Sequence, residues 1–238
     1  MHSTESDQVL AAADAAVPHH PSPPWREWIS QIAPLWFARR WLAHPERLVV
    51  RRYTMPIAGL AKELEGLRIA HLTDLHLGRC VGPDYVRAVV DRAMALKPDI
   101  FALTGDYVEN ARSSLGVMAE LLAPLADRSR SNAIATVAVL GNHDWYAGAE
   151  RVAAALRSAG LTVIDNARVH LGRNRELLDG AAPPEALCIA GFGDLGHDDT
   201  RPFEALGGVD PDAARLVLAH HPDTAEEPIL AKRDELRI

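Results

Sequence analysis

The chain has 238 residues, of which 48% are hydrophobic, and this is enough to bury the core of one main domain. The formal net charge of −7 argues against a broad basic face, so we expect no nucleic acid partner, whereas a small phosphorylated substrate is compatible with it. The two cysteines, Cys80 and Cys188, are too few for a disulfide framework. A cytoplasmic location, or a peripheral one on the inner membrane, is therefore favoured over secretion.

Two segments precede the expected domain. Residues 1–24 combine small polar residues with prolines and histidines, a composition that predicts a flexible tail. Residues 25–46 form an arm in which Trp25–Leu42 carries four of the five tryptophans together with arginines. Such a segment suits a membrane surface, although the alternative of a helical arm packed on the domain stays open, and Pro34 would interrupt either helix. No run of residues reaches the roughly 18 apolar residues that cross a bilayer.

Short β-rich runs alternate with amphipathic helices from Leu67 onward, which predicts an α/β fold. In chain order, the expected strands are Leu67–Thr73, Asp99–Thr104, Ala133–Leu140, Leu161–Ile164, Leu187–Ala190 and Arg215–Ala219. The expected helices are Asp84–Leu96, capped by Asp84, then Ser113–Ala126, Ala149–Ala159 and Thr224–Ile238. Ala167–Pro184 has no readable pattern and is expected to be a loop that sets specificity.

Polar clusters follow four of these strands. They are Asp74-Leu75-His76, Gly105-Asp106, Gly141-Asn142-His143-Asp144 and His220-His221. Any one of them would be read as a helix cap or a turn. Ligands bind beyond the carboxyl ends of the strands in open α/β sheets, so four such clusters together predict one shared site.

The residue types in these clusters suit divalent metals. Asp74 and His76 lie two apart, so in an extended segment both side chains would point to the same side and hold one ion. Asp106 follows a glycine that allows a sharp turn, and its two carboxylate oxygens can bridge two cations. Asn142 and His220 add an amide oxygen and an imidazole nitrogen, a mixed set that suits manganese, iron or zinc. The pattern predicts a two-metal hydrolase.

The ordered motifs resemble those of the calcineurin-like metallophosphoesterases, over about residues 47–223. The lead-in from Leu48 to His76 looks like a bacterial branch that includes membrane-associated phosphodiesterases and the UDP-diacylglucosamine pyrophosphohydrolases of lipid A synthesis. The resemblance implies a four-layer α/β/β/α sandwich over residues 47–238. It also implies hydrolysis of a phosphomonoester, phosphodiester or pyrophosphate bond in a small phosphorylated substrate or a lipid-linked phosphate.

The resemblance also assigns roles to the residues. Asp74 and His76 would bind the first metal, Asp106 would bridge, and Asn142 and His220 would bind the second. A metal-bridging hydroxide would then attack phosphorus.

The substrate would be held by Asn142 and by His143. His143 would steady the phosphate or protonate the leaving group, and a hydrogen bond that it donates to Asp144 would orient it. The role of His221 stays open.

The family pattern finishes with Gly-His-x-His, which this sequence lacks after His220. Gly196-His197 precedes the His220 strand and cannot take its place. We therefore expect a chain cut short, without the last strands of the fold. The alternative function is a metal-poor, non-catalytic binding or membrane-surface module.

A glycine pattern raises one further alternative, a dinucleotide-binding site. Gly191–Gly196 matches the GxGxxG pattern of dinucleotide sites. Acidic residues follow it, where pyrophosphate would have to bind. This argues against a dinucleotide site.

Overall fold

The computed structural model describes residues 47–178, 182–197 and 199–226. The tail predicted for residues 1–24 and the arm predicted for residues 25–46 lie outside the described residues, as does the predicted last helix beyond Glu226. Within the described ranges, no helix has the length and apolar character required to cross a membrane.

The first sheet is entirely parallel. Its strands are β1 (Ile69–Leu72), β2 (Ile100–Thr104), β3 (Ala135–Val139) and β4 (Thr162–Val163), hydrogen-bonded in that order. Every residue of β2 and β3 is buried, as expected for central strands covered on both faces. Because the four strands run the same way, their carboxyl ends lie along one edge of the sheet.

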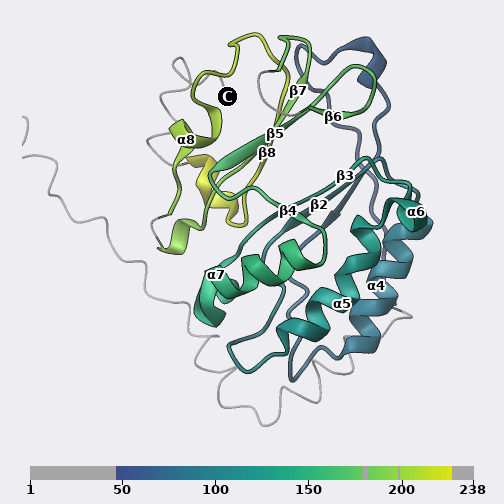
Figure 1. The fold of residues 1–238 in the computed structure, drawn as a ribbon, viewed down its shortest axis with the longest axis vertical. Coiled ribbons are helices and arrows are strands. Elements are labelled where there is room, and N and C mark those ends of the chain that lie inside the picture. Colours follow the sequence, from purple (N-terminus) through teal and green to yellow (C-terminus); the bar gives the residue numbers. More distant parts are fainter. Residues whose placement is uncertain (1–46, 179–181, 198, 227–238) are drawn as a thin grey trace, which may run out of the picture. The chain divides into compact units, whose positions relative to one another are not determined.

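Helices cover one face of this sheet (Figure 1). They are α4 (Pro83–Ala95), α5 (Leu115–Ala126), the short α6 (Arg128–Ser131) and α7 (Asn142–Ser158). Their apolar faces pack on the sheet in a core that includes Val90, Leu122 and Leu156. Ser114 caps α5 by accepting from the Val117 N–H.

The second sheet is mixed. Its strands are β5 (Ala167–Leu171), β6 (Leu177–Leu178), β7 (Leu187–Gly191) and β8 (Arg215–Leu218), in the order β6-β5-β7-β8. β5 is antiparallel to β6 and β7, whereas β7 and β8 are parallel. The short helix α8 (Pro202–Leu206) packs on the outer face through Ala205 and Leu206.

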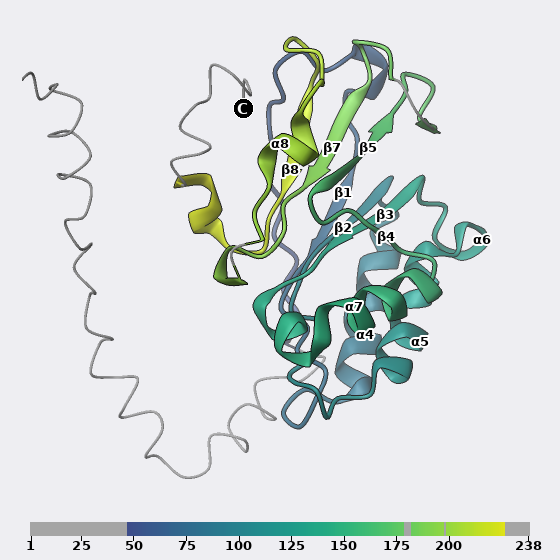
Figure 2. The same cartoon turned by 60° about the vertical axis from the view of Figure 1, so that its left-hand side comes forward.

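The two sheets pack face to face through a second apolar core, which includes Leu64 in the short 3-10 helix η2 (Lys62–Leu64), Val137 and Ile189. Figure 2 shows helices, sheet, sheet and α8 in succession. The predicted α/β/β/α sandwich is confirmed. In the part of the chain that the structure describes, the fourth layer contains the short helix α8. The 3-10 turn η3 (Leu195–His197) lies against α7, and a further 3-10 turn, η4 (Pro222–Glu226), follows β8.

Several predicted boundaries were wrong. The helix α7 begins at Asn142, seven residues before the predicted start, and bends at Gly148, whose φ of 102° is not helical. The expected loop Ala167–Pro184 contains β5 and β6, because cross-strand pairing supplies order that its mixed sequence does not signal. Gly82, not Asp84, caps α4, with Pro83 as its first residue.

Candidate metal centre

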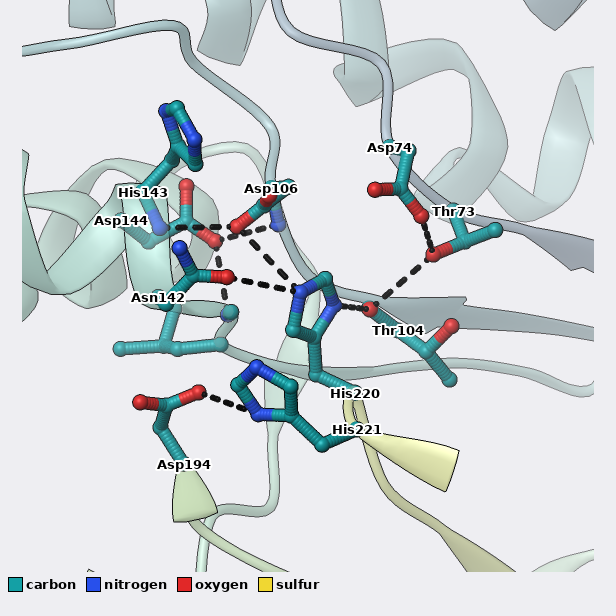
Figure 3. A network of polar contacts seen from close by, with 12 residues as sticks. Thr73, Asp74, Thr104, Asp106, Asn142, His143, Asp144, Asp194, His220 and His221 are labelled. Atoms are coloured by element: carbon teal, nitrogen blue, oxygen red, sulfur yellow. Dashed lines mark hydrogen bonds and ion pairs between the residues drawn. The ribbon is translucent and has the colours of Figure 1, made fainter. Parts of the chain in front are cut away.

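The four predicted polar clusters meet at one place (Figure 3). Three follow β1, β2 and β3 of the first sheet, and the fourth follows β8 of the second. The two sheets are joined there by a contact of 2.7 Å between His220 Nδ1 and the carbonyl oxygen of Thr104, the last residue of β2. The carboxyl ends of strands from both sheets therefore supply the same site.

Asp106 lies at the middle of the cluster, with 3% of its surface exposed. One carboxylate oxygen, Oδ2, lies 3.3 Å from His76 Nε2. The other, Oδ1, lies 3.6 Å from His220 Nε2 on the opposite side. The two oxygens thus face different sets of donors, the arrangement that a bridging ligand requires.

Asp74 and His76 approach each other, with 3.5 Å between Asp74 Oδ1 and His76 Nε2. The hydrogen bond with His76 is the main cause that lowers the pKa of Asp74 to about 2, and the Thr73 hydroxyl, 2.6 Å from Asp74 Oδ2, adds to it. The same bond raises the pKa of His76.

The backbone that carries these two residues differs from the prediction. The expected extended segment was wrong, because β1 ends at Leu72 and both residues have left-handed backbone, with φ of 55° and 46°.

Asn142 and His220 form the other side of the cluster, with Asn142 Oδ1 3.2 Å from His220 Nε2. Because His220 Nδ1 lies against the Thr104 carbonyl oxygen, the Nδ1 atom carries the proton and Nε2 is left with its lone pair. An orienting partner of this kind is typical of metal-binding histidines.

His143 is held by two contacts. Its backbone N–H donates to Asp106 Oδ1 over 2.9 Å, and its Nδ1 lies 2.7 Å from the carbonyl oxygen of Glu109. Its ring stands edge-on to the ring of His76, with centroids 4.6 Å apart. The Nε2 atom of His143 is therefore the one available to a ligand.

The structure gives Asp144 other partners than the predicted one. Its buried carboxylate accepts three backbone N–H groups, those of Gly141 at 3.0 Å, Asp106 at 2.8 Å and Tyr107 at 3.0 Å. Burial raises the pKa of Asp144 to about 7. His143 is oriented by the Glu109 carbonyl, so the predicted hydrogen bond between His143 and Asp144 was wrong. Asp144 instead joins the loops after β2 and β3.

Two glycines let these loops touch. Gly105 has a φ of 87°, and a Cβ there would lie 2.6 Å from the Cα of Gly141. A Cβ at Gly141 would lie 2.7 Å from the backbone nitrogen of Asp106 and 2.9 Å from His220 Cε1. Side chains at either position would push the loops and the metal-binding groups apart.

The donor set fits divalent metals. The ligand atoms of His76, Asp106 and His143 lie within 4.8 Å of one another, and so do those of Asp74, Asp106 and His220. Carboxylate oxygens and imidazole nitrogens are the ligands that manganese, iron and zinc accept. His143 therefore lies in the first of these two groups of candidate metal ligands. The sequence had predicted for it only a role toward the phosphate.

The comparison with known families agrees with this geometry. The family model of the calcineurin-like phosphoesterases matches residues 67–235, which is more than half of the chain. The chain belongs to the calcineurin-like phosphoesterase family. The match includes all four clusters of this phosphoesterase site.

Curated relatives of this member of the family come from both animals and bacteria. A transmembrane protein with a metallophosphoesterase domain from Danio rerio is 29% identical over 76% of this chain and 40% of its own length. An uncharacterized metallophosphoesterase from Aquifex aeolicus is 31% identical over 76% of this chain and 65% of its own length. The phosphodiesterase YaeI of Escherichia coli is 32% identical over 67% of this chain and 54% of its own length. The chain thus spans 40 to 65% of these three relatives.

Sequence reasoning missed the groups that support the phosphoesterase site. Thr104 and Glu109 act through their carbonyl oxygens, which every residue possesses, so no sequence signal marks them. Thr73 could have been noticed as a hydroxyl directly before the aspartate that it contacts.

Proposed function

We propose that this protein is a metal-dependent phosphoesterase that hydrolyses a phosphomonoester, phosphodiester or pyrophosphate bond with two divalent ions of manganese, iron or zinc. The observation that carries the proposal is Asp106, whose two oxygens face His76 on one side and His220 on the other. Family membership supports the same reaction class.

The residues divide between the two proposed ions. Asp74 and His76 would hold the first, Asn142 and His220 would hold the second, and Asp106, which belongs to both groups of neighbouring ligand atoms, would serve both. When bound, such ions lower the pKa of water and offset the negative charge of the phosphoryl oxygens.

The chain's own residues then hold the substrate. Asn142 Oδ1 faces His220, so the amide nitrogen is directed elsewhere and is the group proposed to donate to a phosphoryl oxygen. As an imidazolium, His143 would donate its Nδ1–H to the Glu109 carbonyl, and its Nε2–H is proposed to donate to a second oxygen or to the leaving group. Asp144 acts by fixing the loops that carry Asp106 and Gly141.

The proposed substrates are a small phosphorylated molecule or a lipid-linked phosphate. The relative from Escherichia coli is named a phosphodiesterase, which favours a diester. The net charge of −7 favours a small substrate over nucleic acid. Trp25–Leu42 is proposed to contact a membrane surface, which would place the enzyme in the cytoplasm or on the inner membrane.

The test is hydrolysis of bis-p-nitrophenyl phosphate and p-nitrophenyl phosphate after loading with manganese, iron or zinc, with bound metal measured in parallel. We expect turnover by the wild type and a loss of at least about 100-fold in Asp106→Asn, since a direct ligand of both ions is weakened. Asp127→Asn, an exposed helix cap, is the matched control and should retain activity. A wild-type protein without bound metal and without turnover would favour the non-catalytic binding module.

A further inference from the structure

A second group of polar side chains lies beside the metal centre and has no part in the reaction proposed above. Its centre is Asp194, in the loop after β7, with 1% of its surface exposed. Asp194 Oδ2 lies 2.6 Å from His197 Nδ1, and Asp194 Oδ1 forms an ion-pair contact of 3.1 Å with His221 Nδ1 (Figure 3). Because a carboxylate accepts hydrogen bonds, the Nδ1 atom of His197 carries the proton and its Nε2 atom is left for another partner.

The loop that carries Asp194 is held in place by a buried side chain. Asn166 Oδ1 accepts the backbone N–H of Gly193 over 3.1 Å and that of Arg201 over 2.8 Å. Asn166 Nδ2 donates to the carbonyl oxygen of Asp199 over 2.6 Å. Both ends of the loop are thus tied to one residue beside β5, and the positions of Asp194 and His197 are set before any ligand arrives.

The ring of His197 belongs to a row of rings that leads back to the metal centre. It stacks on Trp145 with centroids 5.0 Å apart and planes at 13°, and it meets the edge of Tyr146 at 5.1 Å. Tyr146 in turn contacts the ring of His143 at 6.0 Å. Tyr146 is 65% exposed and the His197 side chain 25%, so solvent reaches the row.

His143 and His197 both contact the ring of Tyr146, and both are presented in the same way. Each has its Nδ1 atom tied to an oxygen acceptor, the carbonyl of Glu109 in one case and the carboxylate of Asp194 in the other. Each therefore has its Nε2 atom available to a substrate. A phosphate ester whose reacting phosphate lies at His143 would have its next polar group near His197.

We propose that His197, held by Asp194, is a specificity-determining residue that binds a polar substituent beyond the phosphate that reacts. The inference rests on the proposed phosphoesterase function and narrows its substrate class. A phosphodiester with a hydrogen-bonding second substituent is favoured over a simple monoester, which has nothing to offer His197. Asp194 is a positioning residue, because it acts through the imidazole ring.

The experiment compares two substrates that share one leaving group. p-Nitrophenyl phosphate is a monoester, and the p-nitrophenyl ester of thymidine 5′-monophosphate is a diester with a polar second substituent. We expect His197→Ala to raise KM for the diester about 10-fold, the value of one hydrogen bond to a polar or charged group, and to change KM for the monoester less than about 2-fold. The kcat values and the bound metal should stay near those of the wild type.

Three further variants separate binding from a general loss of structure. His197→Gln places an amide near the position of Nε2 and should restore part of the diester KM, whereas His197→Asn places it near Nδ1 and should not. Asp194→Asn should raise the diester KM in the same direction as His197→Ala. His170→Ala removes an imidazole from β5, away from the row, and should leave both substrates unchanged.

A binding measurement decides the inference independently of turnover. By calorimetry, the wild type should bind thymidine 5′-monophosphate about 10-fold more tightly than inorganic phosphate, and this ratio should fall to about one in His197→Ala. A wild type without that preference overturns the inference, as does a KM change in His197→Ala that is equal for the two substrates. If the wild type turns over neither substrate but keeps the binding preference, the proposed reaction fails while the binding role of His197 stands.

Discussion

At the scale of single residues, three of the proposed metal ligands have backbone that side chains rarely adopt. Asp74, His76 and Asp106 all have positive φ, between 46° and 55°. Such conformations cost on the order of 1 kcal/mol or more each, and they persist where the surroundings over-determine them. The Asp74 and His76 N–H groups are fixed by the carbonyl oxygens of Gly105 and Asp106, so the loop after β1 is tied to the loop after β2. These strained backbone conformations turn the three side chains toward one another.

Gly141→Ala tests the close approach of these loops. The new Cβ would meet Asp106 and His220, so we expect metal content and activity to fall at least about 10-fold with a modest loss of stability. Gly116→Ala is the matched control, because its Cβ would meet open space on α5 and the change should stabilise the helix by about 0.5–1 kcal/mol. Unchanged metal content in Gly141→Ala would show that the loops can separate without harm to the site.

Asp144→Asn tests the structural role of the buried carboxylate. The amide retains one acceptor oxygen but turns an NH2 group toward backbone donors, so we expect the free energy of unfolding to fall by about 1–3 kcal/mol, measured with urea. Activity per folded molecule should change little. The opposite pattern, full stability with lost activity, would restore the role in orienting His143.

At the scale of elements, the short β-rich runs between amphipathic helices were sufficient to find the strands that carry the site. β1, β2, β3, β7 and β8 all fall inside or within one residue of their predicted ranges. The start of α7 was missed because Asn142 and His143 are poor helix formers in isolation, and the helix begins there through the backbone bonds that Asp144 accepts. Supporting carbonyls such as that of Glu109 depend on tertiary contacts and leave no trace in the sequence.

Tyr107→Phe tests how β2 and β3 are fixed near the site. The buried Tyr107 hydroxyl donates to the carbonyl oxygen of Val139 over 2.8 Å, shortly before Asn142, a proposed metal ligand. Removal of the hydroxyl abolishes its contacts with the Val139 and Leu103 carbonyls, and we expect a loss of about 1–3 kcal/mol in unfolding free energy. Tyr85→Phe on α4 is the control. Equal losses of unfolding free energy in both variants would refute a special role of the Tyr107 hydroxyl in fixing β2 and β3.

Asp165 predicts a pH dependence of stability. Burial, with smaller effects from Asp199 and Asp194, raises the pKa of Asp165 to about 6, above its value of about 3.9 in an unfolded chain. The folded state then binds more protons between about pH 4 and pH 6, so stability falls as pH rises through this range, by up to about 3 kcal/mol. Asp165→Asn still accepts from the Leu140 N–H and should lack this slope. The raised pKa of Asp165 would be contradicted if the free energy of unfolding changed with pH in the same way in the wild type and in the variant from pH 4 to pH 7.

At the scale of the whole described domain, the proposed metal centre would join two sheets that otherwise meet through an apolar core. Asp74, Asp106 and Asn142 follow strands of the first sheet, and His220 follows β8 of the second. An ion held by both sets would bind only the folded state, so it would stabilise the sandwich by an amount that grows with the logarithm of its concentration. At 100 times the dissociation constant this contributes about 2.7 kcal/mol.

The thermal midpoint should therefore rise by about 5–10 °C when manganese is added to that level, and a chelator should reverse the rise. His220→Ala removes the ligand from the second sheet, so its midpoint should respond much less, while His170→Ala on β5 should respond as the wild type does. Calorimetric scans over a series of metal concentrations measure the difference. An equal rise in His220→Ala would mean that the ions are held by the first sheet alone, and the coupling between the two sheets would then have to come from their apolar core.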